Sequence, residues 1–233
     1  MSAEPSDPLG SPAEASLTSV PVKVWDVPVR AIHWSLAALV AFSWWSAKSD
    51  HLDWHRMSGY TILGLLVFRL IWGFVGSQPA RFANFLAGPR TVANYLRGKG
   101  AHQAGHNPLG GWSVVALLSL LGLQVGLGLF SVDEDAIEAG PLDKFVSFDT
   151  GRAITHWHHL MFDLLLVLIA VHLAAIAIYA ARRRNLLGPM ITGRARLAPG
   201  VEAPAMAPLW RIAAAAAAAF AVAWFIAHGL KLV

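Results

Sequence analysis

Five stretches of this sequence are long and apolar enough to cross a membrane as helices, and they constrain the fold more than any other feature. They are residues 32–47, 57–75, 109–130, 158–181 and 209–227. The first is short and is expected to begin a turn earlier, near Val29. The fifth contains an unbroken alanine run at 213–219, and because alanine is only weakly apolar this segment could instead lie at the membrane interface. The chain is 56% hydrophobic and 14% charged, against about 25% charged residues in soluble domains, so we expect an all-α integral membrane protein.

The charges between these segments predict one orientation, because cytoplasmic loops carry an excess of lysine and arginine. Basic residues gather before the first segment, between the second and third, and after the fourth: Lys23, Arg30, Arg81, Arg90, Arg97, Lys99, Arg182, Arg183, Arg184, Arg194 and Arg196. The connection between the third and fourth segments is acidic, with Asp133, Glu134, Asp135, Glu138, Asp143 and Asp149 against Lys144 and Arg152. We therefore expect a cytoplasmic N-terminus and an acidic connection outside, where the C-terminus also lies if the fifth segment spans. Residues 1–22, rich in Ser, Pro and Ala, are expected to form a disordered cytoplasmic tail.

The chain has no cysteine, so its ten histidines are the best transition-metal ligands that it offers. The lack of cysteine rules out disulfides, thiolate metal sites, iron–sulfur ligation and covalent c-type haem attachment. Nucleic-acid binding is not expected either, because the basic residues do not cluster on a soluble face.

Two of these histidines, His158 and His172, are 14 residues apart in the fourth segment. At about 100° per residue, 14 steps return to within roughly 40° of the starting direction, and they cover about 21 Å of helix. One helix therefore presents two stacked imidazoles to one side. The neighbouring His156 and His159 point elsewhere, by about 160° and 140° from His172.

The predicted orientation places four histidines at two depths. His33 at the inner end of the first segment is level with His172, and His55 at the outer start of the second is level with His158. Two imidazoles on facing helices can bind one haem iron from both sides, which leaves no open iron position and favours electron transfer. A single histidine near a helix end more often sits among lipid headgroups. Four of them at two matched depths favour ligation of two stacked haems.

Two further residues are candidate members of this site. Arg69 follows His55 by 14 residues, so it lies on nearly the same helix face but deeper toward the inner side. Its guanidinium could pair with a haem propionate or a quinone carbonyl, or it could snorkel to the inner headgroups. Gly59, one turn after His55, would let a porphyrin approach the backbone.

Other polar and aromatic residues have weaker assignments. Gln124 and Asp163 are expected to bridge helices, and His106 could approach the inner haem. Five tryptophans near segment ends are expected to form an interfacial belt: Trp34, Trp45, Trp54, Trp72 and Trp157.

Several short motifs accompany the histidines: Ala31-Ile32-His33-Trp34, His55-Arg56-Met57-Ser58-Gly59 with Arg69, Gly105-His106-Asn107-Pro108-Leu109-Gly110, Trp157-His158-His159 and Val171-His172. In these motifs the chain resembles the bacterial cytochrome b561 family, also called the nickel–iron hydrogenase b-type cytochrome family, over roughly residues 22–193. The resemblance implies a four-helix bundle in the bacterial inner membrane that holds two b haems on His33, His55, His158 and His172. The fifth segment and the acidic outer connection, which could dock a basic partner, depart from the family pattern.

The resemblance also implies electron transfer across the membrane between a quinone, either ubiquinone or menaquinone, and a periplasmic c-type cytochrome or a dehydrogenase or hydrogenase subunit. We accordingly divide the chain into a tail (1–22), a di-haem domain (23–193) and a linker with the fifth helix (194–233). The oligomeric state stays open, a homodimer included.

Two other functions compete with this reading. A superoxide oxidase that passes electrons to quinone would need a cationic outer surface, to which Lys48, Arg56 and Arg152 could contribute locally, but the acidic connection disfavours it. A histidine-lined ion or metal transporter is disfavoured by the scarcity of intramembrane carboxylates and the lack of an inverted repeat.

Overall fold

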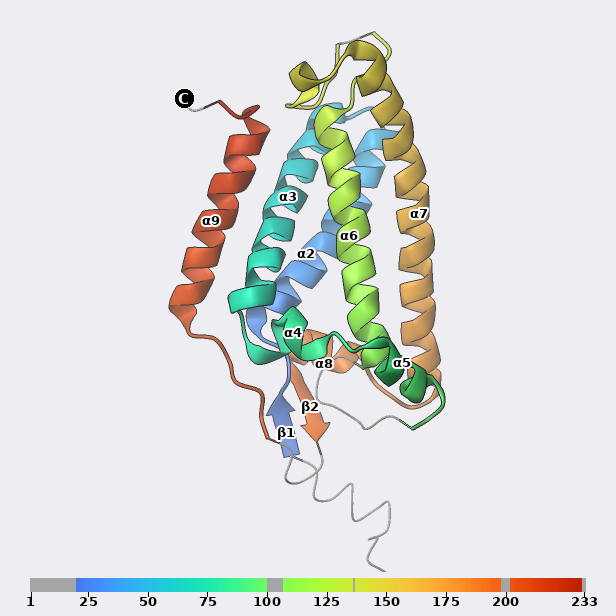
Figure 1. The fold of residues 1–233 in the computed structure, drawn as a ribbon, viewed down its shortest axis with the longest axis vertical. Helices are drawn as coiled ribbons and strands as arrows, with labels where there is room; N and C mark the ends of the chain where they lie inside the picture. Colours follow the sequence, from blue (N-terminus) through green and yellow to red (C-terminus); the bar gives the residue numbers. More distant parts are fainter. Residues whose placement is uncertain (1–19, 100–106, 136, 198–201, 232–233) are drawn as a thin grey trace, which may run out of the picture.

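Five long helices form the body of the protein in the computed structural model, which describes residues 20–99, 107–135, 137–197 and 202–231 (Figure 1). Each of the five is long and apolar enough to cross a membrane. They are α2 (Val27–Lys48), α3 (Leu52–Val75), α6 (Pro108–Phe130), α7 (Phe148–Ala181) and α9 (Leu209–Ala227). The predicted all-α membrane architecture is therefore confirmed, and the fifth apolar segment is a helix with the predicted bounds.

Capping residues explain why several helices begin where they do. Asp26 accepts a hydrogen bond from the Val29 amide at the start of α2, and Asn107 does the same for the Gly110 amide at the start of α6. Ser147 caps α7, which therefore begins at Phe148, well before the apolar stretch that was expected to start near residue 158. The first turns of α7 consequently extend beyond the apolar span.

The short elements lie mostly at one end of the bundle (Figure 1). They are β1 (Val20–Lys23), the 3₁₀ turn η1 (Gln78–Ala80), α4 (Phe82–Phe85), α5 (Pro89–Leu96), α8 (Leu187–Thr192) and β2 (Arg194–Leu197). The opposite end carries the acidic connection with the 3₁₀ turn η2 (Asp143–Phe145). Because the basic clusters occupy the first end and the acidic connection the second, the two ends differ sharply in charge.

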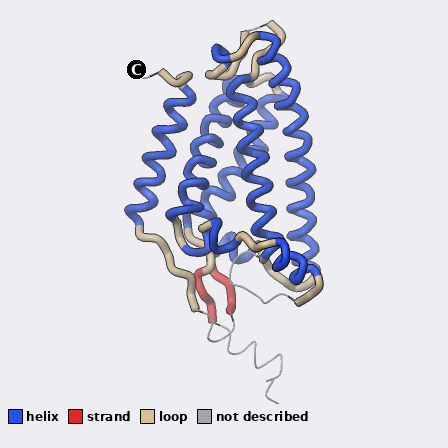
Figure 2. The backbone as a smooth tube through the Cα atoms, in the orientation of Figure 1, coloured by secondary structure: helices blue, strands red, loops and turns tan. Residues whose placement is uncertain are grey.

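The strands β1 and β2 correct one expectation about the N-terminal tail. They pair antiparallel, with Val20 opposite Leu197 and Lys23 opposite Arg194, and form the red hairpin-like pair in Figure 2. Residues 20–22 therefore belong to a strand and not to a disordered tail, while residues 1–19 lie outside the described part of the chain. A strand of four residues is not apparent from its own sequence when its partner is so distant along the chain.

The helix α9 packs along α3, on the side away from α7 (Figure 1). Its contact face consists of small residues at four-residue spacing, Ala215, Ala219 and Ala223, all buried. A Cβ atom on Gly64 of α3 would meet the Ala223 Cβ at 3.6 Å, so the two helices approach closely. The alanines that weaken the hydropathy of α9 are thus the residues that allow it to pack.

Trp72 differs from its expected place in an interfacial belt. Only 1% of it is exposed, and its indole N–H donates to the Asp26 carboxylate at 2.8 Å. The other four tryptophans of the expected belt, Trp34, Trp45, Trp54 and Trp157, are 43–51% exposed. Trp72 is therefore a core residue that holds the start of α2 against α3.

Candidate cofactor site

Two pairs of histidine rings face each other inside the bundle, and α7 contributes to both. His33 of α2 and His172 of α7 have ring centroids 6.3 Å apart, with an angle of 57° between the ring planes. His55 of α3 and His158 of α7 have centroids 6.0 Å apart at 88°. The structure thus brings together the four histidines that depth and helical period had selected, in the pairs expected from their depths.

The separation of each pair suits one metal ion between the two rings. Metal–nitrogen bonds of about 2 Å on both sides, with about 1 Å from each nitrogen to its ring centre, give a centroid separation of roughly 6 Å. Within the described residues, no group of three or more His, Cys, Asp or Glu side chains is placed to hold a metal ion. Each histidine pair alone supplies two ligands, so the remaining ligands would have to come from a macrocycle such as a porphyrin.

Backbone carbonyls of neighbouring helices orient the rings of the His55–His158 pair. Nδ1 of His55 donates to the carbonyl oxygen of Ser43 on α2 at 2.9 Å, and Nδ1 of His158 donates to the carbonyl oxygen of Gln124 on α6 at 3.0 Å. A carbonyl can only accept, so the proton of each neutral ring sits on Nδ1 and the lone pair on Nε2. This is the tautomer that binds iron through Nε2.

Gln124 bridges α6 and α7 as expected, and it also lines the site. It is 7% exposed, and its side-chain nitrogen lies 3.1 Å from Nε2 of His158. Its side-chain oxygen is buried and has no hydrogen-bond partner in the described part of the chain. A buried amide oxygen of this kind normally has a partner, so the Gln124 oxygen is free to accept a hydrogen bond from a group that the described residues do not supply.

Glycines leave open space along α3 and α6, the helices that carry His55 and Gln124. A Cβ added at Gly59, Gly122 or Gly126 would meet no atom within 4 Å. At Gly128, by contrast, a Cβ would approach Cε1 of His158 to 3.0 Å, so only glycine lets that ring lie where it does. Open space along two helices beside a histidine pair is what a flat macrocycle requires, and the residues present therefore fit a haem group.

Arg69 lies buried in α3, toward the end of the bundle where the short elements gather. It is 5% exposed, its guanidinium carbon lies 4.9 Å from the centre of the Phe82 ring, and its Nη1 is buried with no hydrogen-bond partner in the described residues. A buried guanidinium does not reach the lipid headgroups, so this position argues against snorkelling. Phe82, in the four-residue α4, is a neighbour that no sequence pattern singled out.

The other histidines that the structure describes belong to neither pair. His51 packs against Trp54 with ring centroids 4.8 Å apart, and Nδ1 of His228 donates to the Trp224 carbonyl at the end of α9. His156 and His159 are exposed on α7. His102 and His106 fall outside the described residues.

Two of the three basic residues expected to form a local positive patch, Arg56 and Arg152 but not Lys48, form ion pairs with acids. Arg56 forms ion pairs with Asp53 and Glu138, and Arg152 pairs with Glu134. A polar pocket of about 270 Å³ lies here, lined by Asp50, His51, Leu52, Asp53, Trp54 and Glu138. The surface near His55 therefore offers carboxylates more than free cations, which disfavours the attraction of an anion such as superoxide.

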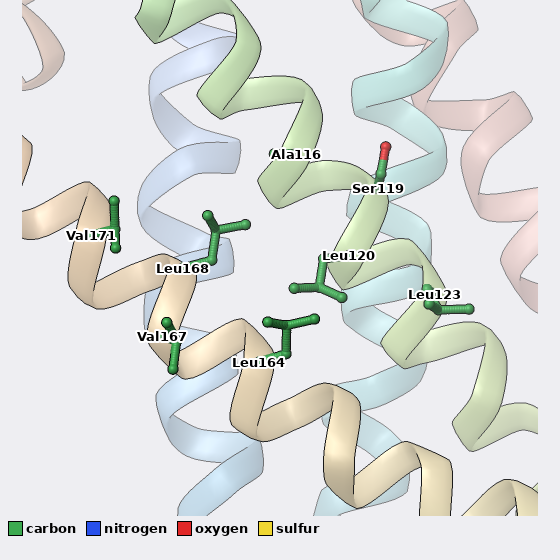
Figure 3. Close-up of a pocket in the computed structure, with 8 residues that line it drawn as sticks. All are labelled: Ala116, Ser119, Leu120, Leu123, Leu164, Val167, Leu168 and Val171. Carbon is green, nitrogen blue, oxygen red and sulfur yellow. The ribbon is translucent and has the colours of Figure 1, made fainter.

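An apolar groove of about 430 Å³ runs between α6 and α7 (Figure 3). Its lining residues are Ala116, Ser119, Leu120, Leu123, Leu164, Val167, Leu168 and Val171. The groove contains no titratable group and suits a hydrocarbon chain. It does not overlap the histidine pairs.

Residues 24–193 match a family model described as prokaryotic cytochrome b561. The match includes all four paired histidines and ends before β2 and α9. No curated protein and no solved structure gives a significant match.

Proposed function

From the premise that this chain belongs to the prokaryotic cytochrome b561 family, and is therefore a membrane b-type cytochrome of electron transfer, we propose that it holds two b haems and conducts electrons from one face of the membrane to the other. His33 with His172 would bind the inner haem, and His55 with His158 the outer. Haem supplies the one-electron chemistry. The observation that carries the proposal is the pair of ring separations, 6.3 and 6.0 Å, at two levels of the same helix.

The chain's own residues would position and insulate these groups. The Ser43 and Gln124 carbonyls hold the outer imidazoles in the tautomer that binds iron. Because two imidazoles would bind each iron, neither iron would have an open position for dioxygen. The long apolar helices exclude water from the path, and α7, which carries one ligand of each pair, would be the common wall of the two sites.

We further propose the domain division and the partners expected from the sequence. Residues 23–193 would form the di-haem domain, with α9 as an addition that packs on α3. The end with β1, β2 and α5 would face the cytoplasm, since it carries the basic clusters. Ubiquinone or menaquinone would exchange electrons with the protein. A periplasmic c-type cytochrome or a dehydrogenase or hydrogenase subunit with a basic docking face would complement the acidic outer end.

Electron transfer through closed vesicles tests this function. The protein is reconstituted in proteoliposomes that enclose ferricyanide, a membrane-impermeant reductant is added outside, and ferricyanide loss is followed. We expect transfer in the wild type and its loss in both His158→Ala and His172→Ala, because each variant breaks one of the two sites. The matched control is His159→Ala, on the same helix but exposed, which should retain transfer. Unchanged transfer in both paired-histidine variants would rule the proposal out.

A further inference from the structure

Arg69 is a buried cation whose charge is incompletely balanced by the described residues. The carboxylate that influences it is Asp26, but both Asp26 oxygens are engaged elsewhere, by the Val29 amide and the Trp72 indole. Arg69 forms no ion pair with any carboxylate in the described residues. A buried charge without a full partner is costly, and its place in the core indicates that it acts on a group that the described residues do not supply.

The position of Arg69 is level with the inner histidine pair. It follows His55 by the same 14 residues that separate His158 from His172. α3 and α7 both begin at the acidic end of the bundle and run toward the other end (Figure 1). Fourteen residues of helix rise about 21 Å both on α3 and on α7. These two rises start from His55 and His158, whose rings are paired. They therefore bring Arg69 to the depth of His172, on nearly the helix face from which His55 reaches its partner.

The outer and inner pairs also differ in hydrogen bonding. Both outer rings donate from Nδ1 to a backbone carbonyl. Within the described part of the chain, no hydrogen bond is formed to the ring of His33 or His172. A carbonyl acceptor makes an imidazole a more basic ligand, which stabilises the ferric state and lowers the reduction potential.

The surrounding charges act in the same direction. A positive charge near an iron centre favours its reduced state, and Arg69 supplies one in the low-dielectric interior at the inner level. At the outer level, Arg56 is compensated by Asp53 and Glu138, and the connection above it is acidic. Charge and hydrogen bonding therefore both make the inner site the stronger electron acceptor.

We propose that Arg69 and the carbonyl-bound outer ligands set the inner haem at a higher reduction potential than the outer haem, so that electrons run downhill from the periplasmic to the cytoplasmic side. This assignment rests on the proposed function. Arg69 acts as a positioning charge: it binds neither iron, and it biases where an electron resides. It makes the periplasmic partner the electron donor and places the acceptor at the Arg69 end of the bundle.

Potentiometric titration followed by visible absorption tests the assignment on the full-length protein in detergent. The variant His158→Ala retains the inner pair and His172→Ala retains the outer pair, so each reports one potential. We expect the inner site to titrate at the higher potential. Arg69→Met removes a unit charge about 10 Å from the inner site, so the reduced-to-oxidised equilibrium of that site should shift roughly tenfold toward the oxidised form. A tenfold shift is about 59 mV for one electron. Arg69→Lys, which keeps the charge, should retain most of the potential.

The matched control is Arg211→Met, which removes a positive charge at the same end of the bundle but on α9, where the guanidinium donates to the Val75 carbonyl. It should leave both potentials unchanged. Equal or reversed potentials, or an inner potential that is the same in Arg69→Met as in the wild type, would overturn the assignment while leaving the two haems in place. Should Arg69→Met not fold, the order of the two wild-type potentials and the Arg69→Lys variant still decide the question. Retention of both haems in His158→Ala and His172→Ala would instead overturn the proposed function itself.

Discussion

Replacement of Gly59 by leucine should stabilise the polypeptide and at the same time prevent haem from binding at the proposed His55–His158 site. Glycine in a helix interior is less favourable than alanine by about 1 kcal/mol, and leucine is close to alanine in this respect. A Cβ at position 59 meets nothing within 4 Å in the structure, so the side chain begins in open space and the haem-free helix should gain this propensity. The same side chain would fill the space one turn below His55 that the porphyrin is proposed to occupy. We expect haem content to fall from two groups per chain to about one.

The measurement is pyridine haemochrome quantitation per chain, paired with detergent unfolding of the haem-free protein. The matched control is Gly64→Ala on the same helix, where the new Cβ would make an ordinary contact with Ala223 at 3.6 Å. It should gain a similar stability and keep its full haem content. A Gly59→Leu protein with two haems and an unchanged spectrum would refute the argument that Gly59 borders the cofactor. A strongly destabilised haem-free protein would refute the claim that the space is open.

Three other outcomes follow from contacts elsewhere in the fold. Asp26→Ala removes both the helix cap, worth about 1 kcal/mol, and the acceptor for the Trp72 indole, worth about 1–3 kcal/mol. Denaturant unfolding should show that the free energy of unfolding falls by about 2–4 kcal/mol. Ala219→Leu overfills the contact between α9 and α3 and should cost about 1–3 kcal/mol in the same assay, whereas Phe220→Leu, on the exposed face of α9, should cost little. Burial, together with a hydrogen bond to the Tyr179 hydroxyl, raises the pKa of Tyr95. The stability that the neutral Tyr95 hydroxyl contributes is therefore complete below about pH 10 and disappears as the pH rises through that raised pKa. Tyr95→Phe should abolish this alkaline dependence of the free energy of unfolding.

The features that the sequence predicts well are those governed by a single dominant constraint. Hydrocarbon thickness sets the length of a span, so α9 could be located to the residue despite its weakly apolar alanines. The helical period and the loop charges together were enough to pair His33 with His172 and His55 with His158.

The features that escaped prediction depend on contacts between distant parts of the chain. Trp72 sits near a helix end like the belt tryptophans, and only its hydrogen bond to Asp26 distinguishes it. The strand β1 depends on a partner at Arg194–Leu197. Ser43 orients His55 through its backbone carbonyl, which every residue type possesses, so no side-chain pattern could have indicated it.

The central claim is that two histidine pairs each hold one haem, and its most direct test is the haem stoichiometry and iron spin state of the purified wild-type protein. Pyridine haemochrome quantitation combined with low-temperature electron paramagnetic resonance provides both. We expect two b haems per chain, both ferric low-spin with bis-imidazole ligation. One haem per chain, or a high-spin iron with an open axial position, would contradict it.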